Sequence, residues 1–324
     1  MHKLALLDDY QNVALRYADW SALQQRCTVQ VFDRNIADPD QAAKLLEPFD
    51  IICLMRERMP MPRALIERLP NLKLALFTGL RTQTLDVEAA SERGVIVCNT
   101  GGGGTDTTAE LTWGLILALT RRIAFEHQGM REGSWQRTVG TKLGGKTLGL
   151  LGLGKIGSQM ARIGRAFGMS VVAWSRSLSD EKANQAGAIC VEKDELFRRS
   201  DVISIHLVLG DESRGLVGAR ELDLMKPTAY LINTSRGPII EEAALLHALS
   251  SERIAGAGLD VFDREPLPED HPLRQLPNVV LTPHLGYVTE EVYRVFFQDA
   301  LETVSAFLDG KPIHVLNPQV LKQT

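Results

Sequence analysis

Short runs rich in Val, Ile and Leu alternate with longer helical patterns along almost the whole chain. Such alternation is typical of parallel strands joined by right-handed crossover helices, so it predicts an α/β protein. The length of 324 residues exceeds the usual size of one hydrophobic core. We therefore expect two domains.

The expected strands form two series, separated by four consecutive glycines at 101–104. The first series covers residues 3–7, 28–32, 50–55, 72–77 and 95–98, and the second covers 147–151, 170–174, 202–206, 229–233, 257–260 and 279–281. After the glycines, the Thr/Asp-rich start and apolar stripe of 105–122 predict a capped helix that crosses between domains. A last helix at about 290–308 is expected to return to the first domain, which makes that domain discontinuous.

A glycine-rich turn follows the first strand of the second series. Gly152, Gly154 and Gly157 give the pattern G-x-G-x-x-G, with Lys155 and Ile156 between the last two glycines at the opening of a helix. The first glycine permits a tight turn, the second lets the backbone approach a pyrophosphate, and the third allows close packing of helix on strand. The context therefore predicts a dinucleotide site, although a turn without a ligand is the alternative.

The residue that recognises the adenosine ribose is expected about 20 residues downstream, at the end of the next strand. That strand is followed by Ser175 and Arg176, so no carboxylate stands there to bind a free ribose 2′-hydroxyl. A hydroxyl and a guanidinium suit a 2′-phosphate, which favours NADP over NAD and leaves NAD open. The alternative is that Arg176 is a solvated loop residue and backbone groups hold the ribose.

Three polar residues follow later strands: Arg236 in N-T-S-R-G-P, Glu265 in V-F-D-R-E-P and His284 in T-P-H-L-G. Taken singly, each has a structural explanation: a brace for a turn, a solvated acid or a satisfied structural histidine. Together with the dinucleotide loop, these stretches resemble the D-isomer-specific 2-hydroxyacid dehydrogenase family, and the resemblance covers nearly the whole chain. The departure from the family pattern is the missing acid at Ser175.

The resemblance implies an oxidoreductase that transfers a hydride between a nicotinamide cofactor and a small 2-keto or 2-hydroxy acid. It implies that Arg236 holds the substrate carboxylate and keto oxygen, that His284 is the general acid/base, and that Glu265 partners the histidine. The chemistry needs these residue types. Reduction of a ketone leaves an alkoxide that needs a proton donor, and a guanidinium stabilises the developing negative charge.

Further site residues follow from the same resemblance. His206 and Asp260 correspond to positions that line the nicotinamide pocket, and we also expect Thr234, Ser235 and Gly286 to bind the cofactor. In the first domain, the loops around Arg56 and around Thr78, Gly79 and Leu80 are expected to offer backbone amides or positive charge to the substrate.

These expectations describe two doubly wound parallel-sheet (Rossmann-like) domains with the active site in the cleft between them. Residues 1–100 with 290–324 form the predicted substrate-binding domain, and residues 101–289 form the dinucleotide-binding domain. No metal is expected, because no His/Cys/Asp cluster has metal-ligand spacing.

The composition limits partners and location. A net charge of −4 and a pI near 6.0 leave no basic excess for nucleic acid. The four scattered cysteines indicate buried, reduced thiols, and no apolar segment reaches the ~20 residues of a membrane span. With no secretory signal, the cytoplasm is the expected location.

The family suggests a homodimer, for which the apolar helix around 108–119 is one candidate contact.

Three other protein classes are alternatives to this prediction. A nicotinamide-sensing corepressor of the same family would keep the triad, but this chain lacks Pro/Ser-rich flanking tails. Formate dehydrogenase pairs its histidine with glutamine, which Glu265 argues against. An L-lactate or malate dehydrogenase would open with the dinucleotide loop, whereas here that loop begins at Gly152.

Overall fold

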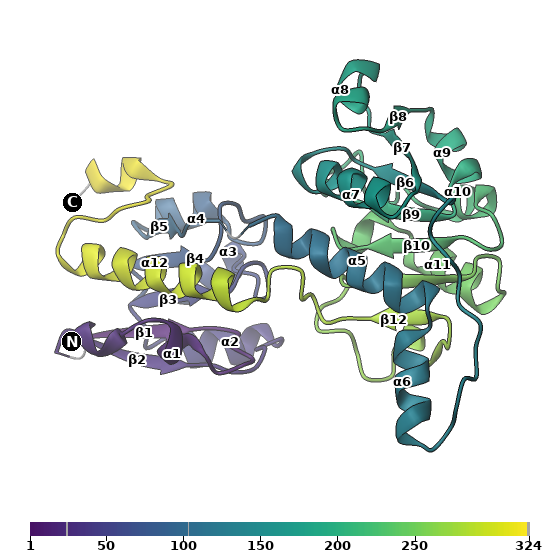
Figure 1. Cartoon of the computed structure of the whole chain (residues 1–324). Helices are drawn as coiled ribbons and strands as arrows, with labels where there is room; N and C mark the ends of the chain where they lie inside the picture. Colours follow the sequence, from purple (N-terminus) through teal and green to yellow (C-terminus); the bar gives the residue numbers. More distant parts are fainter. Residues whose placement is uncertain (24, 103, 323–324) are drawn as a thin grey trace. The chain divides into compact units, whose positions relative to one another are not determined.

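The computed structural model describes residues 1–23, 25–102 and 104–322. The chain divides into two compact units, which Figure 1 traces in sequence colours. Unit 1 contains Met1–Gly103 and Thr289–Thr324, and unit 2 contains Gly104–Val288. The sequence predicted these divisions at residues 101 and 290. The first lies in the glycine run, of which Gly103 is outside the described residues.

Unit 1 is built on a five-stranded parallel sheet of order β2-β1-β3-β4-β5. The strands are β1 (His2–Leu6), β2 (Cys27–Val31), β3 (Ile51–Leu54), β4 (Leu74–Phe77) and β5 (Ile96–Asn99). β3 and β4 are buried along their whole length, as strands covered on both faces should be. The helical segments are α1 (Ala14–Tyr17), η1 (Trp20–Leu23), α2 (Pro39–Leu46), α3 (Arg63–Ile66), α4 (Val87–Glu92), α12 (Glu290–Leu308) and η4 (Pro318–Lys322).

The C-terminal segment completes unit 1. α12 covers the bounds predicted from the sequence, and Thr289 caps it by accepting a hydrogen bond from the Val292 amide. Asp299 of this helix accepts a hydrogen bond from the Gly101 amide at 2.7 Å. Unit 1 is therefore discontinuous in sequence.

Unit 2 is built on a seven-stranded parallel sheet of order β12-β11-β10-β9-β6-β7-β8. The strands are β6 (Thr147–Leu151), β7 (Ser170–Trp174), β8 (Ile189–Cys190), β9 (Val202–Ile205), β10 (Tyr230–Asn233), β11 (Gly256–Leu259) and β12 (Val279–Leu281). The helical segments are α5 (Asp106–Thr120), α6 (Ile123–Arg131), α7 (Lys155–Ala166), α8 (Asp180–Gln185), α9 (Lys193–Arg199), α10 (Ala219–Leu224), η2 (Gly237–Ile239), α11 (Glu242–Ser250) and η3 (Pro272–Gln275). Both predicted parallel sheets are confirmed.

α5 lies where the sequence predicted a helix but lacks the predicted cap. Thr105 at its N-cap is in the right-handed helical region, and its side chain makes no capping hydrogen bond, so the predicted cap is wrong. The helix also buries Trp113, Leu115, Ile116 and Leu119 in a core of unit 2. The apolar stripe of α5 is thus buried inside unit 2, so little apolar surface remains on this helix for contact with a second copy of the chain.

The cysteines are unpaired in the structure: Cys27, Cys53 and Cys98 are buried, and Cys190 is half-buried. Burial raises the pKa of Cys53 and of Cys98 to about 12, so both thiols stay protonated near neutral pH. Among the described helices, none is long and apolar enough to cross a membrane.

Candidate active site

The predicted catalytic residues come from neighbouring strands of unit 2. β10, β11 and β12 are adjacent and parallel, so their carboxyl ends share one edge of the sheet. Arg236 lies three residues beyond β10, and His284 lies three residues beyond β12. Glu265 belongs to the loop that follows β11. The topology brings the three loops together at the edge where open α/β sheets bind ligands.

His284 and Glu265 form a direct pair. The Nδ1 atom of His284 lies 2.6 Å from Oε2 of Glu265, and the two side chains are 20% and 30% exposed. The other carboxylate oxygen of Glu265 accepts a hydrogen bond from the Phe262 amide at 2.9 Å. The carboxylate is therefore hydrogen-bonded to Nδ1, and Nε2 is the ring nitrogen that remains to exchange a proton with a ligand.

The backbone of His284 is held in the left-handed region, with φ of 55°. Its amide donates to the carbonyl oxygen of Asp260 at 2.8 Å. The buried carboxylate of Asp260 accepts three further hydrogen bonds, from the Thr282 hydroxyl and the Leu285 and Gly286 amides, at 2.6, 2.7 and 2.9 Å. Asp260 therefore ties the whole T-P-H-L-G loop to the end of β11.

Arg236 lies beside the same pair because of a close backbone approach. A Cβ added to Gly237 would meet the carbonyl carbon of Phe262 at 2.1 Å, so only glycine allows the two loops to touch. Asn233 shapes the turn by accepting from the Ser235 amide and donating to the Arg236 carbonyl oxygen. Nη1 of Arg236 donates to the carbonyl oxygen of Ser235 at 2.7 Å, which restrains the guanidinium.

The charges of the site act on one another. Partial burial acts to raise the pKa of Glu265, but the hydrogen bond to His284, the positive charges of His284 and Arg236, and the Phe262 amide outweigh it. The pKa of Glu265 therefore lies below its ordinary value, and the group is a carboxylate at neutral pH. For Asp260 the balance is opposite, because burial raises its pKa in spite of its hydrogen bonds.

The glycine-rich turn has the geometry that a pyrophosphate requires. Gly152 has φ of 98°, and an added Cβ would lie 2.5 Å from the carbonyl oxygen of His206. An added Cβ on Gly157 would lie 2.2 Å from the carbonyl oxygen of Gly152, whereas Gly154 borders open space. Gly154 is also the N-cap of α7, so the amides of Lys155, Ile156 and Gly157 in its first turn have no intrahelical acceptors. The turn fits a dinucleotide phosphate.

His206 begins the loop after β9, and its amide donates to the Leu151 carbonyl oxygen at 2.7 Å. Its Nε2 lies 2.8 Å from the buried Ser204 hydroxyl. Burial lowers the pKa of His206 to about 3, so the ring is neutral at physiological pH. His206 thus borders the glycine turn as an uncharged hydrogen-bonding group.

Three other predicted cofactor residues form hydrogen bonds within unit 2. The Thr234 hydroxyl lies 2.8 Å from that of Thr112 on α5, which ties the end of β10 to the helix. The Ser235 hydroxyl donates to the Leu207 carbonyl oxygen. The Gly286 amide is bound to Asp260, and its carbonyl oxygen accepts from Thr107 and Thr108. These contacts within unit 2 hold the residues in place at the carboxyl ends of β10 and β12.

Ser175 and Arg176 directly follow β7, beside the glycine turn. The Gly152 amide donates to the carbonyl oxygen of Trp174, the last residue of that strand. Arg176 forms an ion pair with Glu212 from the loop after β9. Glu212 could not be predicted from the sequence, because the spacing rule points only to the strand that follows the glycine turn.

In unit 1, two predicted substrate amides have internal partners. The Gly79 amide donates to the Thr100 hydroxyl at 2.8 Å, and the Arg56 amide donates to the Thr78 hydroxyl at 2.9 Å. The side chain of Thr78 is fully buried. The amides of Gly79 and Arg56 thus each have a hydrogen-bond partner within unit 1, and the Thr78 hydroxyl binds within its own pair of loops. Arg56 Nη1 contacts the Thr78 carbonyl oxygen at 3.4 Å, while the Leu80 side chain is exposed.

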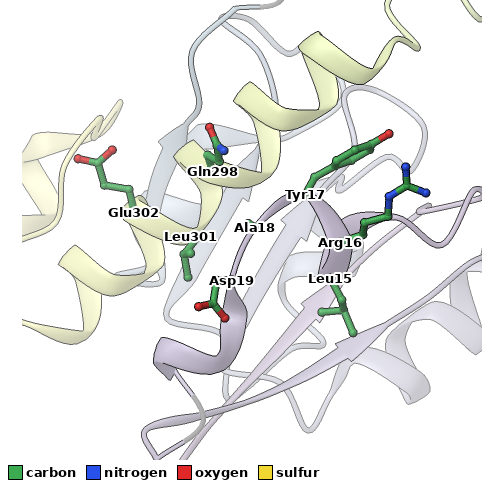
Figure 2. A pocket seen from close by; sticks show the side chains of 8 residues that line it. All are labelled: Leu15, Arg16, Tyr17, Ala18, Asp19, Gln298, Leu301 and Glu302. Carbon is green, nitrogen blue, oxygen red and sulfur yellow. The ribbon is translucent and has the colours of Figure 1, made fainter.

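A surface pocket of about 430 Å³ lies in unit 1 (Figure 2). It lies between the segment 15–19 and three residues of α12, namely Gln298, Leu301 and Glu302. None of the predicted site residues lines it, so it is separate from the candidate active site. Among the residues that the structure describes, no group of three His, Cys, Asp or Glu side chains could hold a metal ion.

A parallel sheet that carries a phosphate-binding glycine turn and a carboxylate-paired histidine is typical of dinucleotide-dependent oxidoreductases. The sequence model of the D-isomer specific 2-hydroxyacid dehydrogenase NAD binding domain matches residues 113–286. The glyoxylate reductase of Aeropyrum pernix is 40% identical over 306 residues, which cover 91% of this chain and 91% of that protein.

Two further relatives agree. The D-3-phosphoglycerate dehydrogenase of Synechocystis is 38% identical over 287 residues, which cover 86% of this chain and 51% of that protein. The crystal structure of a phosphoglycerate oxidoreductase from Vibrio cholerae O395 superposes with a TM-score of 0.90 and 39% identity, covering 96% of this chain and 100% of that one.

The chain therefore belongs to the D-isomer specific 2-hydroxyacid dehydrogenase family. It is an NAD(P)-dependent oxidoreductase of 2-hydroxy and 2-keto acids, and the resemblance stated from its motifs is confirmed. These relatives are named as enzymes, so a corepressor-like sensing protein is not favoured.

Proposed function

We propose that the protein reduces a small 2-keto acid to the D-2-hydroxy acid, with His284 as proton donor and Arg236 as anchor of the substrate carboxylate and keto oxygen. The observation that carries the proposal is the contact of 2.6 Å between His284 Nδ1 and Glu265 Oε2. It leaves the second ring nitrogen for the ligand and holds the ring in one orientation for proton transfer. The nicotinamide cofactor supplies the hydride when bound.

Arg236 has the chemistry for the other half of the reaction. A planar guanidinium forms two parallel hydrogen bonds with a carboxylate and stabilises negative charge that develops on the keto oxygen. His284 then delivers a proton to that oxygen from Nε2, and in the oxidative direction it accepts the proton back. Glu265 keeps the ring oriented throughout. No step in this scheme requires a metal ion.

For the coenzyme, we propose that NADP(H) is preferred to NAD(H). The support is that β7 ends without a carboxylate, and that Ser175 and Arg176 offer a hydroxyl and a guanidinium beside the glycine turn. A ratio of catalytic efficiencies at or below one, NADPH over NADH at one ionic strength, would refute this preference.

The substrate class is a small 2-keto acid, and glyoxylate is the first candidate because a glyoxylate reductase is 40% identical over most of both chains. The test is a panel of keto acids, including glyoxylate and pyruvate, assayed for oxidation of NADPH and NADH. D-3-phosphoglycerate is assayed in the oxidative direction. Absence of turnover with every acid would overturn the proposed activity.

His284→Ala is the matched variant for this panel. Loss of a general acid should reduce turnover by about 10² to 10⁴ while the dissociation constant of the coenzyme stays nearly unchanged, because the proton moves only in the transition state. Replacement of the exposed His127 by Ala is the control. Turnover of His284→Ala near the wild-type value would exclude the assigned role.

We further propose a homodimer, located in the cytoplasm. α6 and the chain that follows it extend away from the rest of unit 2 (Figure 1) and expose apolar side chains of Ile123, Met130, Trp135 and Val139. A charge introduced by Val139→Asp should lower the mass measured by light scattering to that of a monomer. Ile189→Asp, at an exposed apolar site on β8, is the control; equal masses for wild type and Val139→Asp would exclude this surface.

A further inference from the structure

Two loops flank the start of the glycine turn in unit 2. β6 ends at Leu151 and lies between β7 and β9 in the sheet. Leu151 is in register with Trp174 of β7 on one side and with Ile205 of β9 on the other. The residues that leave β7 and those that leave β9 therefore both border Gly152. A dinucleotide phosphate on this turn would have one loop on each side.

The loop after β9 has a defined shape. The buried Ser213 hydroxyl accepts from the Gly210 amide at 2.8 Å and donates to the Val208 carbonyl oxygen at 2.7 Å. The amides of Ser213 and Arg214 both donate to the Gly210 carbonyl oxygen at 3.0 Å. Glu212 directly precedes the buried serine, so its position is set by this closed turn and not by a freely moving loop.

Glu212 forms an ion pair with Arg176, and the two side chains are 66% and 62% exposed. Arg176 is the cation expected to attract a 2′-phosphate at the adenosine ribose. The pair thus crosses from one flanking loop to the other, over the end of β6. The β7 strand end has no carboxylate of its own. Through this pair, the Glu212 carboxylate lies beside the position expected to bind the adenosine ribose.

We infer that Glu212 is a specificity-determining residue for the coenzyme, which weakens the binding of NADP(H) relative to NAD(H). This inference rests on the proposed function of the glycine turn and deepens it. A 2′-phosphate must compete with the Glu212 carboxylate for the Arg176 guanidinium, and the two anions repel each other. A ribose 2′-hydroxyl carries no charge, so it meets neither penalty and can donate to the same carboxylate. Glu212 therefore moderates the preference that Arg176 creates.

The test compares dissociation constants of NADPH and NADH, measured by coenzyme fluorescence on the full chain without any keto acid. Glu212→Gln should raise the ratio of NADH to NADPH dissociation constants by about two- to fivefold, the effect of one exposed charge pair. Asp211→Asn removes the same charge from the neighbouring position and should leave the ratio at the wild-type value. In the Glu212→Gln background, Arg176→Ala should lower the ratio more than in wild type, because the guanidinium is then fully available.

An unchanged or lower ratio in Glu212→Gln would overturn the inference. An equal rise in Asp211→Asn would also overturn it, since the effect would then belong to the general charge of the loop. Strict additivity of Arg176→Ala and Glu212→Gln would exclude the ion pair as the route. Because the titration contains no keto acid, a failure of the turnover panel leaves this result unaffected.

Discussion

At the scale of single residues, the site depends on how His284 is held as much as on its ring. A non-glycine residue at φ of 55° is uncommon, and histidine tolerates it better than branched residues do. The hydrogen bond from its amide to Asp260 and the pairing of Nδ1 with Glu265 fix both the backbone and the ring. The ring also packs edge-on against Tyr287, with centroids 5.5 Å apart. Backbone, ring plane and tautomer are thus each restrained by a different neighbour.

Arg236→Lys should fail to preserve activity. A point ammonium cannot reproduce the planar, two-pronged contact of a guanidinium with a carboxylate. We expect kcat/KM to fall by about 10²-fold, as for loss of a donor to a developing oxyanion, with losses in both kcat and substrate affinity. Arg264→Lys, an exposed arginine next to Glu265, is the control. Near-normal kcat/KM in Arg236→Lys would exclude bidentate binding.

Glu265→Gln should change the pH profile of reduction. The pKa of Glu265 lies below its ordinary value, so near neutral pH a negative charge lies beside the ring that transfers the proton. Without that charge, the alkaline limit of keto-acid reduction should move to lower pH. Glu269→Gln, an exposed acid of the same segment, should leave the profile in place. Superimposable profiles for Glu265→Gln and wild type would mean that the carboxylate serves only the fold.

At the scale of elements, the sequence predicted most strands because parallel strands buried on both faces are continuous apolar runs. β6, β7 and β12 have the predicted bounds. β8 was missed because its two residues, Ile189 and Cys190, are too few to form a recognisable run. The cap of α5 was wrong because a Thr before a helix satisfies the composition rule without adopting the extended backbone that capping needs.

The candidate site shows a similar limit. Spacing to a strand end identified Gly152, Arg236 and His284, since each follows a strand whose ending is visible in the sequence. Contacts between loops cannot be predicted from the spacing of residues along the sequence. The pairing of Arg176 with Glu212 joins residues from strands on opposite sides of β6, and the internal use of the Gly79 amide by Thr100 depends on two loops that only the fold brings together.

His206, which follows β9, should contribute a measurable acid sensitivity. Burial lowers its pKa to about 3, while an unfolded chain protonates a histidine near pH 6.5. The contribution of neutral His206 to the free energy of unfolding is therefore fully present above about pH 6.5. It is lost as the pH falls toward 3, at up to about 1.4 kcal/mol per pH unit. His206→Gln should remove this contribution, so the free energy of unfolding should fall less steeply between about pH 6 and 4.

Urea unfolding at several pH values measures this slope. The exposed His127 on α6 provides the control, and His127→Gln should keep the wild-type slope. Equal slopes for His206→Gln and wild type would show that His206 is not held neutral in the folded protein.

At the scale of the whole molecule, each unit has a hydrophobic core of its own. The core of unit 1 gathers residues such as Leu46, Ile52 and Phe77, and unit 2 has two clusters around Phe197 and Trp113. The predicted coenzyme residues all lie in unit 2, whereas unit 1 needs the C-terminal segment to complete its fold. Damage to that segment should therefore destabilise one unit and spare the coenzyme site of the other.

Asn317 provides the test of this independence. It is 1% exposed, and its side chain accepts from the Val97 amide at 2.8 Å and donates to the Val95 carbonyl oxygen at 2.9 Å and to the Ser91 hydroxyl at 2.8 Å. Asn317→Ala leaves these buried backbone groups without partners, at an expected cost of about 2 to 4 kcal/mol to unit 1. Hydrogen exchange should then accelerate in peptides of β5 and stay unchanged in peptides of β6, with an unaltered dissociation constant for the coenzyme.

Gln319, an exposed amide of the same segment that contacts Ser91 at 3.3 Å, provides the control. Gln319→Ala should change neither the hydrogen-exchange rates nor the coenzyme dissociation constant. Equal acceleration in β5 and β6 would mean that the two units unfold together, and the separation of their stabilities would have to be abandoned.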